Sequence, residues 1–332
     1  MKATQQALSW LAALSLAVAA PAVAGPLDRP ETYEFPSRTV GTHAVGRHPI
    51  DLAFAPNGEA WVANLSDGTV SRLGPDGRLL GTHKVAPEPR KIAFDSYGNG
   101  WVYCWGDNVL VQLSPTGVPM GRFAVGNTVN DMAFDQGGNL WLASSGSNAV
   151  IQLAPNGRVV STQTVTMPNH LAIDAQGLVW VASVSPKGTT NLVALGAGRM
   201  EGYQMPATPQ SIAVGPDGRV WVTYFDSTGR VSRLSADRRR VDDLWTGFSN
   251  ASVEVDRGAL WVSNTRYDMS RREQGYIDVD SPISNTVSHL SPGGRVLGTY
   301  SVGSDAWLVK VAPGGEPWVV NFLGGTVTRL KP

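Results

Sequence analysis

The 332-residue sequence contains a single cysteine, Cys104, so no disulfide can form within the chain and the fold must rest on packing and hydrogen bonds. Lys and Arg together number 27, as do Asp and Glu, so no excess of one charge sign predicts binding to nucleic acid or to an anionic membrane. Its one long apolar stretch, residues 7–20, is too short to span a bilayer as a helix. We therefore expect neither a disulfide-stapled scaffold nor a membrane span.

The first residues have the pattern of a secretory signal. Lys2 precedes the apolar stretch, and Ala22-Val23-Ala24 forms a small-residue cleavage motif before Gly25. We expect residues 1–24 to be a signal peptide and the proline-containing residues 25–36 to be a leader. The pattern predicts an exported protein, in the bacterial periplasm or outside the cell.

What the sequence does contain is a tryptophan that returns at nearly constant intervals of 40, 40, 39, 41, 40 and 57 residues. The repeat positions are Trp61, Trp101, Trp141, Trp180, Trp221, Trp261 and Trp318. Within the first unit, four strand-like segments, 50–55, 60–64, 69–73 and 78–85, are separated by turns such as Pro56-Asn57-Gly58. A period of about 40 residues built from four short strands predicts a β-propeller.

The seventh unit ends after its third strand, and the N-terminus supplies a match for the missing one. Residues 38–46 are similar to the fourth strands of the first and sixth units, 78–86 and 295–303. We therefore predict an all-β, seven-bladed propeller over residues 37–332, with four-stranded antiparallel blades and a ring closed by the N-terminal strand, which completes the last blade. The extra 17 or so residues in unit six predict an insertion at about 265–285.

Two sets of residues are expected at the channel mouth, on the face that carries the longer loops between strands two and three and between blades. Amides and hydroxyls are frequent in both sets, which favours a polar ligand, although they could also only cap strand ends. The first set opens each innermost strand: Ile50, Arg90, Asn130, Asn169, Gln210, Asn250 and Trp307. The second set lies three residues after each repeat tryptophan: Asn64, Cys104, Ser144, Ser183, Tyr224, Asn264 and Asn321.

Other residues near the mouth are candidates for stacking or for catalysis. Trp105 and Trp307 lie outside the repeat slot, where an aromatic ring could stack on a ligand. His170, Asp131 and Asp305, together with Asp51, are candidates for acid–base or metal-assisted chemistry. Within the insertion, Asp278 and Asp280 offer oxygen ligands for Ca²⁺, although two carboxylates alone are a weak signal.

The repeat also resembles that of a known family. The pattern Pro-x-x-Ile-Ala-x-x-Pro-x-Gly-x-x-Trp-Val at residues 209–222 is similar to the repeat of streptogramin B lyases (virginiamycin B lyase-like proteins), and it is close to NHL repeats. The resemblance covers residues 37–332. It implies a seven-bladed propeller that opens a cyclic depsipeptide ester by elimination, with Mg²⁺ and a His general base near the mouth. Here Asp305 is the counterpart of an acidic position near the last blade, whereas the positions where the family commonly has Glu carry the second set of mouth residues.

Two function hypotheses follow. The first is an exported, monomeric propeller that binds a polar small molecule or an envelope protein at the mouth without chemistry of its own. The alternative is a metal-dependent lyase or hydrolase of the streptogramin B lyase type, acting on a cyclic ester with His170, Asp131 and Asp305. The two differ in whether carboxylates and a histidine converge on one point.

Overall fold

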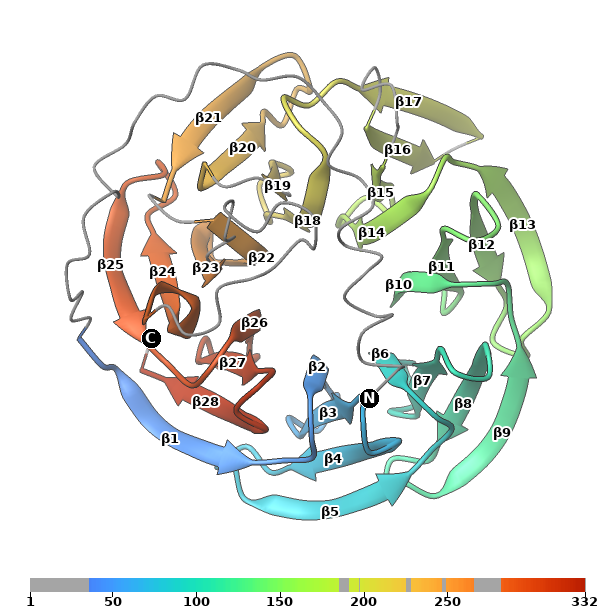
Figure 1. The fold of residues 1–332 in the computed structure, drawn as a ribbon. Coiled ribbons are helices and arrows are strands. Elements are labelled where there is room, and N and C mark those ends of the chain that lie inside the picture. The colour runs from blue at the N-terminus through green and yellow to red at the C-terminus, as the bar shows by residue number, and fades with distance from the viewer. Residues whose placement is uncertain are drawn as a thin grey trace, which may run out of the picture.

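Seven four-stranded antiparallel sheets surround a central channel in the computed structural model, which describes residues 36–184, 191–196, 198–224, 228–246, 249–265 and 282–331 (Figure 1). The predicted signal peptide, most of the leader and most of the insertion, including Asp278 and Asp280, lie outside these residues. Within them, no helix is long and apolar enough to cross a membrane.

Each of the first six blades is a run of four consecutive strands, ordered from the channel outward. Blade one holds β2 (Pro49–Phe54), β3 (Ala60–Asn64), β4 (Thr69–Leu73) and β5 (Leu79–Lys84). Blade two holds β6 (Pro89–Phe94), β7 (Gly100–Cys104), β8 (Val109–Leu113) and β9 (Pro119–Ala124). Blade three holds β10 (Val129–Phe134), β11 (Leu140–Ser144), β12 (Ala149–Leu153) and β13 (Val159–Thr164).

The remaining blades repeat this order. Blade four holds β14 (Pro168–Ile173), β15 (Val179–Ser183), β16 (Leu192–Gly196) and β17 (Arg199–Tyr203). Blade five holds β18 (Pro209–Val214), β19 (Val220–Tyr224), β20 (Arg230–Leu234) and β21 (Val241–Trp245). Blade six holds β22 (Ser249–Asp256), β23 (Ala259–Thr265), β24 (Thr286–Leu290) and β25 (Val296–Ser301), with the 3₁₀ helix η2 (Pro282–Asn285) before β24.

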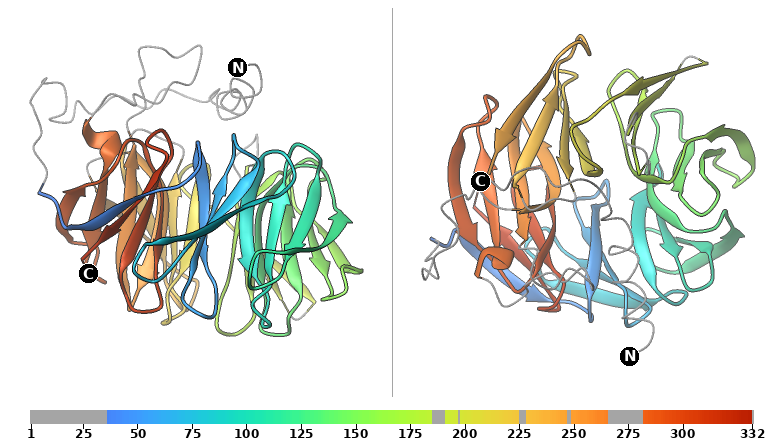
Figure 2. Two further views of the ribbon diagram at one scale, coloured as in Figure 1. Left: turned by 90° about the horizontal axis from the view of Figure 1, so that it is seen from below. Right: turned by 45° about the horizontal axis from the view of Figure 1, so that its top comes forward.

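Blade seven is assembled from both ends of the described chain. β26 (Ala306–Val311), β27 (Pro317–Asn321) and β28 (Thr326–Leu330) are joined on the outside by β1 (Thr39–Ala44). β1 runs antiparallel to β28, with Thr42 opposite Thr328, and Figure 2 shows it beside the red strands of this blade. The predicted closure by the N-terminal strand is confirmed, and it ties the first and last blades together by backbone hydrogen bonds.

The repeat tryptophans pack between neighbouring blades. Trp61 lies against Val102 and Val111 of blade two, and Trp318 lies against Leu52 and Val62 of blade one. Five of the seven are at most 1% exposed. An indole fills the wedge between two twisted sheets with one large rigid side chain, so the same residue recurs once per blade. The ring is therefore held by packing that needs no ligand.

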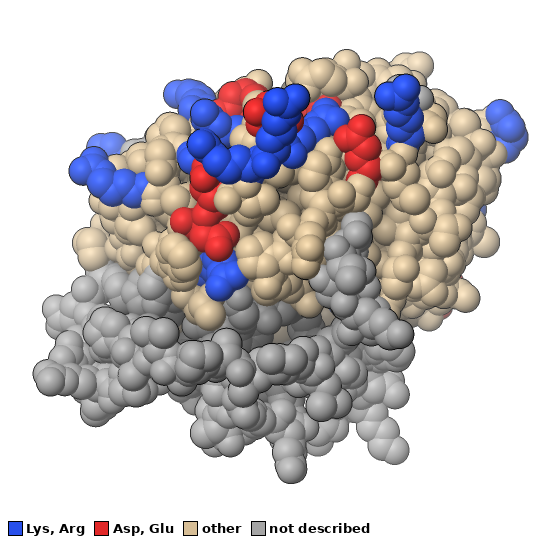
Figure 3. Space-filling view, turned by 90° about the horizontal axis from the view of Figure 1, so that it is seen from above, with Lys and Arg blue, Asp and Glu red and all other residues tan. Residues whose placement is uncertain are grey.

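Charged side chains on the rim of blades four and five are mostly paired. Arg238, from the basic run 238–240, lies over the Trp180 ring at 5.3 Å and 3.5 Å from Glu201, while Arg233 pairs with Asp242 at 2.8 Å. Figure 3 looks at this side of the ring and shows basic and acidic side chains intermixed. The basic run thus takes part in contacts between blades.

Candidate binding site at the channel mouth

The first set of predicted mouth residues owes its position to a β-bulge that recurs in every blade. Register shifts by one residue between Pro49 and Asp51 of β2, between Pro89 and Lys91 of β6, and at the matching place in the other inner strands. The residue between the two is left without a partner on the neighbouring strand. A bulge re-aims the side chain of its extra residue, and on an innermost strand the free edge faces the channel. The bulged residues are Ile50, Arg90, Asn130, Asn169, Gln210, Ala251 and Trp307.

Asn250 was expected in this ring, and the structure replaces it with Ala251. In blade six, Trp261 pairs with Glu254, seven residues earlier, whereas Trp61 pairs with Ala53, eight residues earlier. The difference arises because the turn between β22 and β23 is one residue shorter, with Arg257 and Gly258 both at positive φ, as a two-residue hairpin turn requires. Counting eleven residues back from Trp261, as in the other blades, therefore gives Asn250, one residue before the bulged Ala251. Asn250 is buried and donates to Arg230 O at 3.2 Å.

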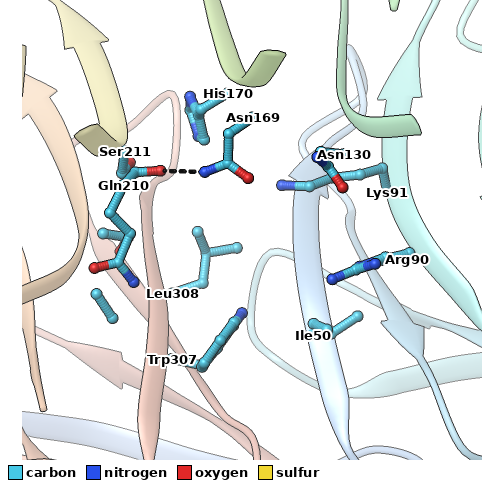
Figure 4. Close-up of a pocket in the computed structure, with 12 residues that line it drawn as sticks. Ile50, Arg90, Lys91, Asn130, Asn169, His170, Gln210, Ser211, Trp307 and Leu308 are labelled. Carbon is cyan, nitrogen blue, oxygen red and sulfur yellow. Dashed lines mark hydrogen bonds between the residues drawn. The ribbon is translucent and has the colours of Figure 1, made fainter. Parts of the chain in front are cut away.

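The bulged residues enclose a cavity of about 110 Å³ together with the residues that follow them (Figure 4). Ile50, Trp307 and Leu308 provide apolar lining, and none of the described residues that line the cavity is acidic. The polar and charged lining residues are Arg90, Lys91, Asn130, Asn169, His170, Gln210, Ser211 and Ser252. Side chains from separate blades thus converge on one small space.

Arg90 lies at this mouth without an ion-pair partner among the described residues. No carboxylate of the described chain lies within 4.0 Å of its guanidinium, which instead lies over the ring of Trp105 at 5.2 Å. Burial lowers the pKa of Arg90, while Tyr103 and Glu88 act more weakly in the opposite direction. Trp105, predicted as a stacking residue for ligand, is half-buried beneath Arg90 and does not itself line the cavity.

The amides of the ring are oriented by the backbone of the next blade. Asn130 Nδ2 donates to Pro168 O at 3.2 Å, and Asn169 Nδ2 donates to Gln210 O at 3.1 Å. Each NH₂ group uses one of its two N–H donors in this way, and each Oδ1 remains an acceptor for another group. The buried Oε1 of Gln210 likewise has no partner within the part of the chain that the structure describes.

Below this ring, four residues that follow the bulges form a chain of charges across blades one to four. Lys91 Nζ lies 3.6 Å from Asp51 Oδ1 and 3.3 Å from Asp131 Oδ1, and His170 Nδ1 lies 3.2 Å from Asp131 Oδ2. Asp51 Oδ2 accepts from the backbone Ile92 N of the next blade at 2.8 Å, and Asp131 Oδ2 also accepts from Leu171 N at 2.9 Å. These contacts link the inner strands of blades one to four.

Burial and pairing set the protonation of these groups. Burial would lower the pKa of Lys91, but Asp131 and Asp51 more than offset this effect, and the net shift is upward. Burial dominates for His170 and lowers its pKa to about 4, so the imidazole is neutral at pH 7. Burial raises the pKa of Asp51; for Asp131 the positive charges of Lys91 and of protonated His170, with the Leu171 N–H, outweigh burial and lower it.

A second ion pair replaces two of the small repeat residues. Lys310 and Glu254 take the position that Ala53 holds in blade one, opposite the repeat tryptophan, and their Nζ and Oε2 atoms lie 3.0 Å apart. Burial would lower the pKa of Lys310, but Glu254 raises it, and the ammonium stays charged. Lys91 and Lys310 are thus matched by carboxylates, and Arg90 is not.

The second predicted set lies inside the blades rather than at the mouth. These residues are on the second strand of each blade, whose two faces both meet neighbouring blades, so their side chains cannot reach the channel edge. Asn64 accepts from Gly46 N at 3.0 Å and donates to Thr69 Oγ1 and Ser71 Oγ at 3.0 and 2.9 Å. None of the set lines the cavity, and all seven residues are buried: Asn64, Cys104, Ser144, Ser183, Tyr224, Asn264 and Asn321.

Asp305 joins neither the cavity lining nor the contact between Asp131 and His170. It is 3% exposed, has φ 58°, and its backbone N–H donates to Asn285 Oδ1 at 2.8 Å. Its Oδ1 has no partner among the described residues, and burial raises the pKa of this carboxyl to about 6. The three predicted catalytic residues therefore form one contact, between His170 and Asp131, with Asp305 outside it.

The described residues do not fit a Mg²⁺ or Ca²⁺ site at the mouth. Both oxygens of Asp131 already face Lys91, His170 or the Leu171 N–H. Within the described ranges, no group of three or more His, Cys, Asp or Glu side chains is arranged to hold a metal ion. A hard divalent cation needs several free oxygen ligands, which this cluster does not offer.

Comparison with known proteins places the chain by fold. No family model and no curated protein matches the sequence. A streptogramin B lyase structure is 13% identical, with a TM-score of 0.71 over 88% of this chain and 96% of the other. A catalytically inactive virginiamycin B lyase variant from Staphylococcus aureus with quinupristin is 12% identical, with a TM-score of 0.68 over 88% and 99%.

The same fold occurs in proteins of other activities. Kuenenia stuttgartiensis hydrazine synthase is 13% identical, with a TM-score of 0.71 over 87% of this chain and 97% of the other. Such identities show a shared fold and nothing finer. The predicted likeness to virginiamycin B lyase-like propellers is thus confirmed at the level of fold: the chain is a seven-bladed β-propeller.

Proposed function

We propose that this propeller is an exported binding protein that takes up a polar small molecule, or a polar group of an envelope protein, at the channel mouth. The observation that carries the proposal is the convergence of bulged side chains from separate blades, among them Arg90, Asn169, Gln210 and Trp307, on one cavity. The tryptophan packing already holds the blades together, so polar groups aimed into an opening are available for a ligand.

The proposal is tested by isothermal titration calorimetry of the purified protein against small probes of different chemistry: N-acetyl amino acids, their carboxamides, hexoses and polyols. We expect saturable binding of at least one class, weakened about tenfold or more by Gln210→Ala. Gln163→Ala is the matched control, since Gln163 is an exposed amide on the outer strand β13. If no class binds, or if both variants bind like the wild type, a polar ligand at the mouth is wrong.

A lyase or hydrolase remains the second candidate because His170 and Asp131 are in contact within the mouth region. The pKa of about 4 makes His170 a weak base, and the carboxylates of the cluster are already engaged, so we derive no step through a metal. The melting temperature of chelator-stripped protein separates the two candidates. A saturable rise with Mg²⁺ would favour the enzyme, whereas no rise is expected from the binding proposal.

A further inference from the structure

Within the cavity, Arg90 is the one lining cation that the described chain leaves uncompensated. Lys91 lies between Asp51 and Asp131, at 3.6 and 3.3 Å, and so its charge is balanced from within the protein. Arg90 has no described carboxylate within ion-pair distance, although it is half-buried and cannot lose its proton at ordinary pH. A charge removed from water without a partner is unfavourable, so this site favours an anion that comes from outside the chain.

We propose that the ligand of this mouth is a carboxylate, bound by the Arg90 guanidinium, that carries a neighbouring N–H or O–H donor and an apolar substituent. This inference rests on the proposed function and names the ligand class for the same site. Trp105 supports the guanidinium from one side, with Arg90 Cζ 5.2 Å from the centroid of the indole ring. A planar guanidinium held in this way presents two parallel N–H groups, which match the two oxygens of a carboxylate.

The neighbouring groups provide acceptors for an N–H or O–H donor beside the carboxylate. Asn130 and Asn169 each use one N–H on a backbone carbonyl, which leaves each of them an acceptor oxygen and a second N–H. The buried Gln210 Oε1 is a third acceptor without a described partner. Acceptor oxygens bind an amide N–H, an ammonium or a hydroxyl and repel further anionic oxygens. A carboxylate with an adjacent donor therefore satisfies both kinds of group.

The apolar lining residues of the cavity account for the apolar part of the ligand. Ile50, Trp307 and Leu308 line it, and Trp307 is half-buried with its ring centroid 5.9 Å from that of Phe322. The cavity of about 110 Å³ is open to solvent on one side, so it holds one end of a ligand while the rest extends outward. An N-acyl α-amino acid, free or as the C-terminal residue of a peptide, combines the carboxylate, the N–H and the apolar side chain, and its acyl end can extend out of the mouth.

The experiment measures the Kd of the purified protein for N-acetyl-leucine, N-acetyl-leucinamide, acetyl-Gly-Gly-Leu and inorganic phosphate by calorimetry. The acid and the amide differ mainly in charge, so we expect at least tenfold tighter binding of the acid. Arg90→Gln should weaken the acid at least tenfold and leave the amide unchanged. Arg158→Gln, which removes an exposed arginine from a turn on the opposite face, is the matched control. Arg90→Lys keeps the positive charge but loses the two parallel N–H groups, so its Kd for the acid should lie between those of the wild type and of Arg90→Gln.

Each result decides between the inference and the function on which it rests. Equal binding of acid and amide, an unchanged Kd in a folded Arg90→Gln protein, or tighter binding of phosphate would overturn the carboxylate and leave the polar-ligand proposal standing. The carboxylate would also be wrong, with the polar-ligand proposal intact, if neither leucine derivative bound but a hexose or polyol bound and Gln210→Ala weakened that binding. If no probe bound, both the carboxylate inference and the polar-ligand proposal would be wrong. Tighter binding of the tripeptide than of N-acetyl-leucine would identify a peptide C-terminus as the source of the carboxylate.

Discussion

Asp305→Asn should change the pH dependence of stability in a way that only a buried, unpartnered carboxyl explains. Burial raises the pKa of Asp305 from 3.8 to about 6. At 1.36 kcal/mol for each pKa unit, ionising this group in the folded protein costs about 3 kcal/mol of unfolding free energy at pH 7. The folded pKa lies above the unfolded one. The contribution of Asp305 to stability is therefore fully present below pH 3.8 and is lost as the pH rises through 6.

Asparagine keeps the shape of the side chain and tolerates the left-handed backbone at φ 58°. It removes the charge, so the variant should be more stable than the wild type by up to about 3 kcal/mol at pH 8 and nearly equal to it at pH 4. Burial of His170, with a pKa of about 4, acts in the opposite direction. It lowers the stability of both proteins as the pH falls from 6.5 to 4, and so it cancels in the difference.

The assay is urea unfolding of both proteins, followed by tryptophan fluorescence at pH 4, 5, 6, 7 and 8. Asp107→Asn, which removes an exposed carboxylate from a loop on the same face, controls for the change in net charge. A difference in unfolding free energy that stays constant with pH would refute the assignment of an uncompensated buried carboxyl to Asp305.

Two further substitutions test the charge chain and the ring packing by the same urea assay. Lys91→Met leaves Asp51 and Asp131 without a counter-charge and should cost roughly 3 to 5 kcal/mol, whereas Lys84→Met on the outer strand β5 should change little; equal losses would count against the cluster. Gly77→Ala places a Cβ 2.1 Å from His43 Nε2 at φ 85° and should cost about 1 to 3 kcal/mol, with Gly314→Ala, which meets nothing within 4 Å, as control.

The architecture can be predicted from the sequence because each blade of a propeller repeats the same local pattern of strands and turns. The tryptophan interval, the Asn-Gly and Asp-Gly turns and the similarity of residues 38–46 to other fourth strands predict blade count and closure, and the structure confirms both. The first ring follows from the same period except in blade six. A signal was present there, since Val253 replaces the alanine that the first five units have eight residues before the tryptophan.

The repeat period does not reveal in which direction a side chain points or which residue it pairs with. Asn64 seemed to border the mouth because it ends a strand, but it is on a second strand, where both faces meet other blades. The contact of Lys91 with Asp51 and Asp131 joins residues 40 positions apart, and no local pattern encodes that pairing. Arg90 stands out only when these neighbours have been matched with each other.

The central claim, a ligand at the mouth, is tested most directly by ¹⁹F NMR of protein labelled with 5-fluorotryptophan. The Trp307 resonance is assigned with Trp307→Phe, and the exposed Trp245 on the rim serves as the internal control. On titration with N-acetyl-leucine and the other probes, the account predicts a saturable shift of the Trp307 signal for at least one probe, with Trp245 unchanged. Binding heat from a probe that leaves Trp307 unmoved would contradict it.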